Sequence, residues 1–162
     1  MKRLIDGYNV ILSDQKLSKL LRNDNEIGRR EFLGEILRSN RHSREEITVV
    51  FDGRFAASAA NESTRLLVRF TSRGETADDF IKREIGASPN RRSLIVVSND
   101  LSIVSYAREC GAGTQTSGEF LAAIREKRIT APDTGRDSGE KPEPTGRPDP
   151  ELLRLFSGER KK

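Results

Sequence analysis

The chain has 162 residues, the length of one ordinary domain with at most a short appendage. It contains one cysteine and one histidine, which excludes a disulfide framework, a multi-cysteine zinc site and a histidine-based metal cluster. Chemistry in this chain must therefore use carboxylates, hydroxyls, amides and basic side chains. The formal net charge of +4 is a weak indication of a polyanionic partner.

No targeting or membrane segment is expected. Asp6 interrupts the apolar residues near the N-terminus before the core of a signal peptide could form. No stretch approaches the roughly 18 consecutive apolar residues that a membrane span needs. We therefore expect a cytoplasmic protein that has no membrane partner.

The composition changes at about residue 131. Residues 131–150 hold five of the six prolines and no large apolar residue, which predicts a disordered or extended linker. Residues 151–162 begin with ELLRLF, a short amphipathic helix candidate, and end in a basic tail. This helix either docks back on the domain or holds a partner. The folded domain is therefore expected over residues 1–130.

Residues 1–130 alternate between strand and helix patterns. Residues 47–51 (ITVVF) and 94–97 (LIVV) are apolar at consecutive positions, which is typical of strands buried on both faces. Residues 2–5 and 66–70 are further strand candidates. The predicted helices cover, in chain order, residues 26–39, 76–85, 101–110 and 116–127.

The ends of these helices carry recognisable signals. Gly86 and Gly111 are predicted to follow the ends of two helices, and Thr116 with Glu119 predicts a capping box at the start of the last one. Buried strands that alternate with helices predict an α/β domain, built as three α/β/α layers around a mostly parallel sheet.

Acidic residues follow three of the predicted strands, namely Asp6, Asp52 and Asp100. Because the carboxyl ends of parallel strands share one edge of a sheet, we expect these side chains to converge. Asp78 and Asp79 lie in the first turn of the helix over 76–85, which begins at the same edge if it precedes a parallel strand.

Such a group of carboxylates is costly unless a cation neutralises it. Hard oxygen ligands suit Mg²⁺ or Mn²⁺, and a metal held this way can orient a water for in-line attack on a phosphodiester. The sequence therefore suggests metal-dependent phosphoryl chemistry.

Each acidic residue also has a purely structural explanation. An aspartate after a strand is often the N-cap of the next helix, and Asp100 could cap the helix that follows, although Ser98 and Asn99 are available for that role. Asp79 could complete a capping box with Thr76, which makes Asp78 the better ligand candidate. Asp52 with Gly53 could form a simple turn.

Four short motifs together resemble the NYN domain (YacP-like) ribonucleases of the PIN-like superfamily. They are DGYN at 6–9, VFDG at 50–53, ETADDFI at 75–81 and VSND at 97–100. The match runs over about residues 2–127, and LLRLF at 152–156 also resembles the ending of such chains. The resemblance implies a PIN-like fold and a metal-dependent endoribonuclease that uses Mg²⁺ or Mn²⁺ and acts on RNA, in some relatives on messenger RNA at the ribosome.

The resemblance also implies roles for individual residues. Asp6, Asp78 and Asp100 would bind the metal, Asp52 would complete the cluster, and Asp79 is an additional ligand candidate. Asn9 would support Asp6 or a water on the metal.

Cleavage is expected to leave a 5′-phosphate and a 3′-hydroxyl. We expect Arg73, Arg54 and Lys82 to contact RNA phosphates. Tyr8 either stacks on a base or packs under the first loop. Arg91 and Arg92 precede a strand and are expected at the opposite edge of the sheet.

The main rival hypothesis is a non-catalytic PIN-like module that binds RNA or the ribosome. A phosphatase of the haloacid dehalogenase type fits poorly, since it needs a second aspartate two residues after the first, where this chain has Tyr8. A response-regulator receiver domain fits poorly because it needs an acidic pair after its first strand. The sequence leaves open the oligomeric state and the choice between RNA and DNA.

Overall fold

The computed structural model describes residues 1–40, 43–53, 65–72 and 74–130. Within these residues, a five-stranded sheet forms the centre of the molecule, and every strand pairs in parallel in the order β3-β2-β1-β4-β5. The strands are β1 (Lys2–Asp6), β2 (Glu46–Phe51), β3 (Leu66–Phe70), β4 (Leu94–Val97) and β5 (Gly113–Gln115).

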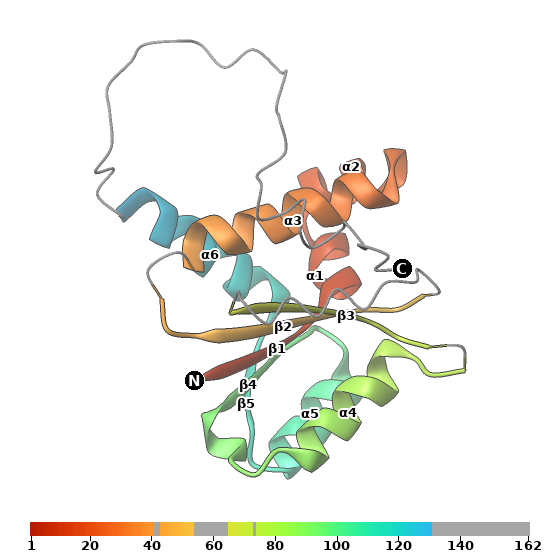
Figure 1. Cartoon of the computed structure of the whole chain (residues 1–162), viewed down its shortest axis with the longest axis vertical. Coiled ribbons are helices and arrows are strands. Elements are labelled where there is room, and N and C mark those ends of the chain that lie inside the picture. The colour runs from red at the N-terminus through yellow and green to blue at the C-terminus, as the bar shows by residue number, and fades with distance from the viewer. Residues whose placement is uncertain (41–42, 54–64, 73, 131–162) are drawn as a thin grey trace, which may run out of the picture.

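Helices cover both faces of the sheet (Figure 1). One face carries α1 (Gly7–Ser13), α2 (Gln15–Asn23), α3 (Asn25–Asn40) and α6 (Ser117–Thr130). The other face carries α4 (Ala77–Ala87) and α5 (Leu101–Glu109), and a short 3₁₀ helix, η1 (Arg91–Ser93), leads into β4. The predicted three-layer α/β/α domain with a parallel sheet is therefore confirmed.

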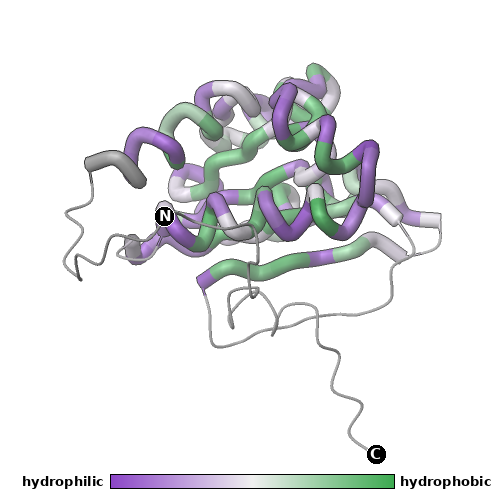
Figure 2. The backbone as a smooth tube through the Cα atoms, turned by 90° about the horizontal axis from the view of Figure 1, so that it is seen from above, coloured by the Kyte–Doolittle hydropathy of each residue, from purple (hydrophilic) through white to green (hydrophobic). Residues whose placement is uncertain are grey.

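Two hydrophobic cores, one on each face, hold the layers together. Neighbouring residues of β1 point to opposite sides, because successive side chains alternate across a strand: Ile5 packs under α1, α3 and α6, whereas Leu4 packs against α4 and α5. Val96 and Val97 of β4 divide in the same way. Figure 2 shows the hydrophobic stretches of the chain running through the interior strands. This explains why these strands are apolar at consecutive positions.

An ion cluster, which we call the Arg125 clamp, joins three helical segments on the first face. The guanidinium of Arg125 on α6 donates to Asp14 Oδ2 at 2.7 Å and to Glu35 Oε2 at 3.0 Å. Asp14 lies between α1 and α2 and caps α2, whereas Glu35 belongs to α3. The clamp therefore fixes α6 against the helices that follow β1.

The structure confirms the four strands predicted from the sequence and corrects several details of the helices. Helices α1 and α2 were not predicted, since both are short and follow one another at Asp14, which ends one and caps the next. Strand β5 lacks the apolar residues that identify a strand. The prediction that Gly86 follows the end of a helix is wrong, because α4 continues to Ala87 and ends just before Pro89.

Other helix signals are confirmed. Gly111 follows α5 with φ of 80°, a conformation that favours glycine. Thr116 and Glu119 exchange the hydrogen bonds of a capping box at the start of α6.

The predicted linker over 131–150, the predicted helix and tail over 151–162, Arg54 and Arg73 lie outside the described residues. None of the helices within the described ranges has both the length and the apolar character needed to cross a membrane.

Candidate active site

The strand register brings the acidic motifs to one edge of the sheet. Asp6, the last residue of β1, pairs with Val50 of β2, and Ile5 pairs with Val97 of β4. The three strands therefore end at nearly the same level, and the loops that carry Asp52 and Asp100 begin there. Helix α4 enters from the same edge, because it leads back to the start of the parallel strand β4.

Gly7 allows the chain to turn directly from β1 into α1. A Cβ atom at this position would lie 2.4 Å from Cε1 of Phe51, which is far inside van der Waals contact. The start of α1 therefore packs against the ring at the end of β2, and a side chain here would push the two apart. This close approach explains why glycine follows Asp6.

Asp6 is held from two sides. Its Oδ1 accepts a hydrogen bond from the backbone N–H of Asn9 at 3.3 Å, which caps α1, and its Oδ2 accepts one from the hydroxyl of Ser98 at 3.4 Å. Burial raises the pKa of Asp6, and the negative charges of Asp100 and Asp78 raise it further, against the lowering effect of the two hydrogen bonds. Asp78 and Asp100 thus both lie close enough to repel Asp6, and we call Asp6, Asp78 and Asp100 the acidic edge.

Asp100 caps helix α5, so its structural explanation is confirmed in preference to capping by Ser98 or Asn99. Its Oδ1 accepts from the backbone N–H groups of Ser102 at 2.7 Å and Ile103 at 3.4 Å. Its own N–H donates to Ser98 Oγ at 3.0 Å. Ser98 therefore joins Asp6 to Asp100, and no hydrogen bond from the described residues reaches Asp100 Oδ2.

Asp78 has no capping role and is arranged differently. Its Oδ2 accepts from the ammonium of Lys82 at 3.1 Å, one helical turn along α4. Its Oδ1 is buried and has no hydrogen-bond partner among the described residues. Because a buried polar atom without a partner is costly, this oxygen marks a position that a cation or a water would stabilise.

Asn9 positions the loop that carries Asp100. Its side-chain oxygen accepts from the N–H of Asn99 at 2.8 Å and from the hydroxyl of Ser117 at 2.9 Å, while Asn99 Oδ1 accepts from the N–H of Ser117 at 2.9 Å. These bonds join α1, the loop after β4 and the start of α6. Sequence reasoning did not find the roles of Ser98 and Ser117, although Ser98 belongs to the VSND motif.

Asp52 and Asp79 make other contacts. Asp52 is exposed, and its Oδ1 accepts from the hydroxyl of Thr71 after β3 at 3.1 Å. Asp79 Oδ2 accepts from the N–H of Thr76 at 3.2 Å and from its hydroxyl at 2.7 Å, which confirms the capping box. The hydrogen bond from the Thr76 hydroxyl, more than any other influence, lowers the pKa of Asp79. Neither residue is among the main causes of the raised pKa of Asp6.

Comparison with known protein families identifies the fold. The sequence model of the YacP-like NYN domain matches residues 3–148. The chain belongs to the YacP-like NYN domain family. This is a family of nuclease type, so the acidic edge is a candidate active site.

Solved structures agree with this assignment. The chain is similar to Rae1 (YacP) from Bacillus subtilis, with 25% sequence identity and a TM-score of 0.65 over 80% of this chain and 76% of Rae1. The W164L mutant of Rae1 gives the same identity and a TM-score of 0.66 over 79% of this chain and 77% of the mutant. No curated protein sequence matches the chain.

The described acidic residues of the NYN site do not form a complete metal site by themselves. Among the described residues, no three or more His, Cys, Asp or Glu side chains form a group that could hold a metal ion by itself. Mg²⁺ typically binds proteins through one or two carboxylates, with waters and substrate phosphates as the other ligands. The buried, unpartnered Oδ1 of Asp78 and the mutual repulsion around Asp6 fit that mode of binding.

The residues predicted to contact RNA are only partly described. Lys82 lies at the acidic edge and also donates to Ser102 Oγ at 2.6 Å. The ring of Tyr8 packs edge-on against Phe51 at 5.1 Å, and its hydroxyl accepts from Arg29 at 2.8 Å, which favours packing over base stacking.

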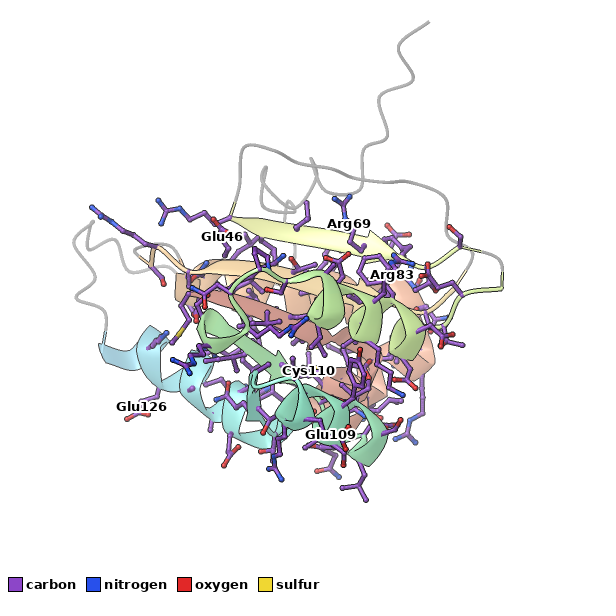
Figure 3. The ribbon with its side chains drawn as sticks, turned by 90° about the horizontal axis from the view of Figure 1, so that it is seen from below. Glu46, Arg69, Arg83, Glu109, Cys110 and Glu126 are labelled. Carbon is purple, nitrogen blue, oxygen red and sulfur yellow. The ribbon has the colours of Figure 1, made fainter. Side chains whose placement is uncertain are left out.

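Two other arginines are occupied by contacts within the protein. Arg91 donates to backbone carbonyls at the end of α4, at the opposite edge of the sheet as predicted. Arg83, which Figure 3 shows on α4, pairs with Glu75.

Proposed function

We propose that this NYN domain is a metal-dependent endoribonuclease that hydrolyses RNA phosphodiester bonds with Mg²⁺ or Mn²⁺ at the acidic edge. The observation that carries the proposal is that Asp78 Oδ1 is buried without a hydrogen-bond partner among the described residues, while the charges of Asp78 and Asp100 both act on Asp6. A buried carboxylate oxygen without a partner lowers the stability of the fold, so stability alone does not account for it. A cation at this position would relieve both the missing contact and the repulsion.

The residues at the acidic edge would have two roles, metal binding and positioning of the metal ligands. Asp78 Oδ1 would bind the ion directly, and the negative charges of Asp6 and Asp100, whose Oδ1 atoms cap α1 and α5, would help to attract it. A bound divalent ion would supply Lewis-acid stabilisation of the phosphate and lower the pKa of water. Ser98 and Asn9 keep Asp6 and Asp100 in place before the substrate arrives, and such preorganisation is a major source of catalysis.

RNA is the substrate that membership of the family favours. Phosphate groups of the RNA backbone would be bound by Lys82 at the acidic edge, and we keep Arg54 and Arg73, which lie outside the described residues, as further candidates. We extend the proposal to messenger RNA in a ribosome-associated, cytoplasmic setting on the basis of the family resemblance of the DGYN, VFDG, ETADDFI and VSND motifs.

One set of observations favours a second candidate, a non-catalytic module that binds RNA or the ribosome. Asp6 and Asp100 are both helix caps, and Asp78 already pairs with Lys82. In such a module these acids would serve the fold alone. The two candidates differ in whether cleavage of RNA depends on Asp78, which has no cap to maintain.

The deciding experiment measures cleavage of an end-labelled RNA in Mn²⁺ by the wild type, Asp78→Asn and Asp24→Asn. We expect Asp78→Asn to lose about 100- to 1,000-fold in rate, the range for removal of one electrostatic group from an active site. Asp24 is the matched control, because it is an exposed aspartate that accepts from the backbone N–H of Glu26 at 2.7 Å and an asparagine can replace that hydrogen bond. Asp24→Asn should cleave at the wild-type rate.

Equal rates for the wild type and Asp78→Asn would exclude the proposed mechanism. Circular dichroism on each variant shows whether it is folded, and Asp78→Ala provides a second test if the asparagine variant is not. RNA binding by a wild type that does not cleave in Mg²⁺ or Mn²⁺ would favour the non-catalytic module.

A further inference from the structure

Lys82 places a positive charge at the acidic edge. Its ammonium lies 3.1 Å from Asp78 Oδ2 and 2.6 Å from Ser102 Oγ, so it bridges α4 to the first turn of α5. The side chains of Lys82 and Asp78 are 29% and 39% exposed, which leaves the pair accessible from solvent. Ser102 in turn donates its N–H to Asp100, so Lys82 is connected to both of these carboxylates.

The ammonium binds one oxygen of Asp78, and the other oxygen has no hydrogen-bond partner within the part of the chain that the structure describes. A single positive charge therefore neutralises part of a group of three carboxylates. Within the described residues, the ammonium pairs with Asp78 and forms no salt bridge with Asp6 or Asp100. The edge thus retains negative charge that a further cation would neutralise.

We infer that Lys82 is an internal counter-ion that holds Asp78 in the metal-free protein and competes with a divalent cation for its carboxylate. This inference rests on the proposed function, since it concerns the metal that the acidic edge would bind. A cation that approaches Asp78 Oδ1 meets the ammonium on the other oxygen of the same carboxylate and is repelled by it. Metal binding then displaces Lys82 from Asp78 and leaves its ammonium at Ser102.

The displaced ammonium has an obvious alternative partner. RNA brings a phosphate to the same edge, and a lysine ammonium binds phosphate as a point charge. Binding of RNA and binding of the metal are therefore coupled. An RNA phosphate would pair with the Lys82 ammonium that otherwise repels the metal, so each ligand strengthens binding of the other. A lysine with a purely structural role would give no such coupling.

The test compares Mn²⁺ binding by calorimetry, without RNA, for the wild type, Lys82→Met, Lys82→Arg and Lys16→Met. Removal of the competing charge should make Lys82→Met bind Mn²⁺ about three- to tenfold more tightly, as expected for a partly exposed charge pair. Lys82→Arg keeps the charge and should bind like the wild type. Lys16 is a matched control, because it pairs with Glu31 on the helical layer and not with the acidic edge.

A second readout is thermal unfolding with and without Mn²⁺. Lys82→Met should melt at a lower temperature than the wild type in EDTA, because three carboxylates remain without their counter-ion, and it should gain more from added Mn²⁺. Weaker Mn²⁺ binding by Lys82→Met would show that Lys82 only positions Asp78, and would overturn the inference. So would unchanged binding.

These failures are separate from failure of the proposed function. A wild type that binds Mn²⁺ and cleaves RNA, beside a Lys82→Met variant with unchanged affinity, overturns the counter-ion alone. A wild type that binds no Mn²⁺ by either readout removes the metal site and the competition together.

Discussion

Two groups of carboxylates in this NYN domain are built in opposite ways. In the Arg125 clamp, Asp14 and Glu35 share one guanidinium at hydrogen-bond distance. In the acidic edge, the ammonium of Lys82 pairs with Asp78 and not with Asp6 or Asp100, and one buried oxygen of Asp78 has no partner among the described residues. In the clamp both carboxylates contact the cation, whereas in the acidic edge only the carboxylate of Asp78 contacts the ammonium.

The pKa values follow this difference. The hydrogen bond from Arg125 lowers the pKa of Asp14, and the hydrogen bond to Asp14 in turn raises the pKa of Arg125. Burial and neighbouring negative charges raise the pKa of Asp6. Folding therefore favours the charged form of Asp14 and disfavours that of Asp6. Carboxylates with a raised pKa, such as Asp6, are candidates for a functional site, because they lower stability unless a ligand binds them. Carboxylates with a lowered pKa, such as Asp14, stabilise the fold.

The largest effect should come from neutralising Asp6. In Asp6→Asn, the amide oxygen can still cap α1 and the repulsion from Asp78 and Asp100 is gone, so the metal-free protein should be at least as stable as the wild type. RNA cleavage should fall by about 100- to 1,000-fold. Urea unfolding in EDTA and a cleavage assay measure the two quantities on the same preparation. If Asp6→Asn loses stability as well as activity, the role of Asp6 is structural, like that of Asp14 and Glu35.

The reverse result is expected for Arg125→Met. This change leaves Asp14 and Glu35 partly buried without their cation, and loss of one partner from a buried pair costs about 3–5 kcal/mol. Because the side chain of Arg125 is 39% exposed, we expect a smaller loss of about 2 kcal/mol in the free energy of unfolding. Cleavage per folded molecule should not change.

The matched control for the clamp is Arg38→Met, which removes an exposed arginine that lies 3.8 Å from Glu31. Loss of such a surface pair should cost under about 1 kcal/mol. Equal effects of Arg38→Met and Arg125→Met on urea unfolding would contradict the role of the clamp.

The smallest effect is the dependence of metal-free stability on pH. The folded-state pKa of Asp6 lies above its ordinary value of 3.8, so the folded protein binds this proton more readily than the unfolded chain does. The advantage of Asp6→Asn over the wild type should therefore be greatest at neutral pH and should shrink as the pH falls toward 3.8.

Asp14 behaves in the opposite sense, because its folded-state pKa lies below 3.8. Asp14→Asn should be less stable than the wild type at neutral pH, and this deficit should persist down to about pH 4 and close only below it. Urea unfolding from pH 7 to pH 3 measures both differences. If the stability difference from the wild type changes with pH in the same way for Asp6→Asn and Asp14→Asn, the acidic edge and the Arg125 clamp do not differ as described.

Much of the fold could be predicted because burial on both faces leaves a plain pattern in the sequence. The runs ITVVF and LIVV predicted β2 and β4, and helical spacing predicted α3. The ends of the predicted strands place Asp6, Asp52 and Asp100 at one edge of the sheet. Helices α1 and α2 escaped prediction because Asp14 serves as both the end of one and the cap of the next.

The details of the site depend on contacts between distant parts of the chain. Ser98 and Asp6 are 92 positions apart, and Ser117 and Asn9 are 108 apart. No local pattern reveals such pairs. In the same way, the sequence does not show that Asp52 accepts a hydrogen bond from Thr71, a contact that distinguishes it from Asp78.

Asp6 and Asp100 both cap helices and belong to the candidate active site, which affects how catalytic activity can be inferred in relatives of this chain. Each of these aspartates ends a strand segment and starts a helix, so a descendant that had abandoned catalysis would still keep both for folding. Their presence in another genome is therefore poor proof of enzymatic competence. Asp78 caps no helix, so under the proposed mechanism its retention or replacement would be the better diagnostic of an active family member.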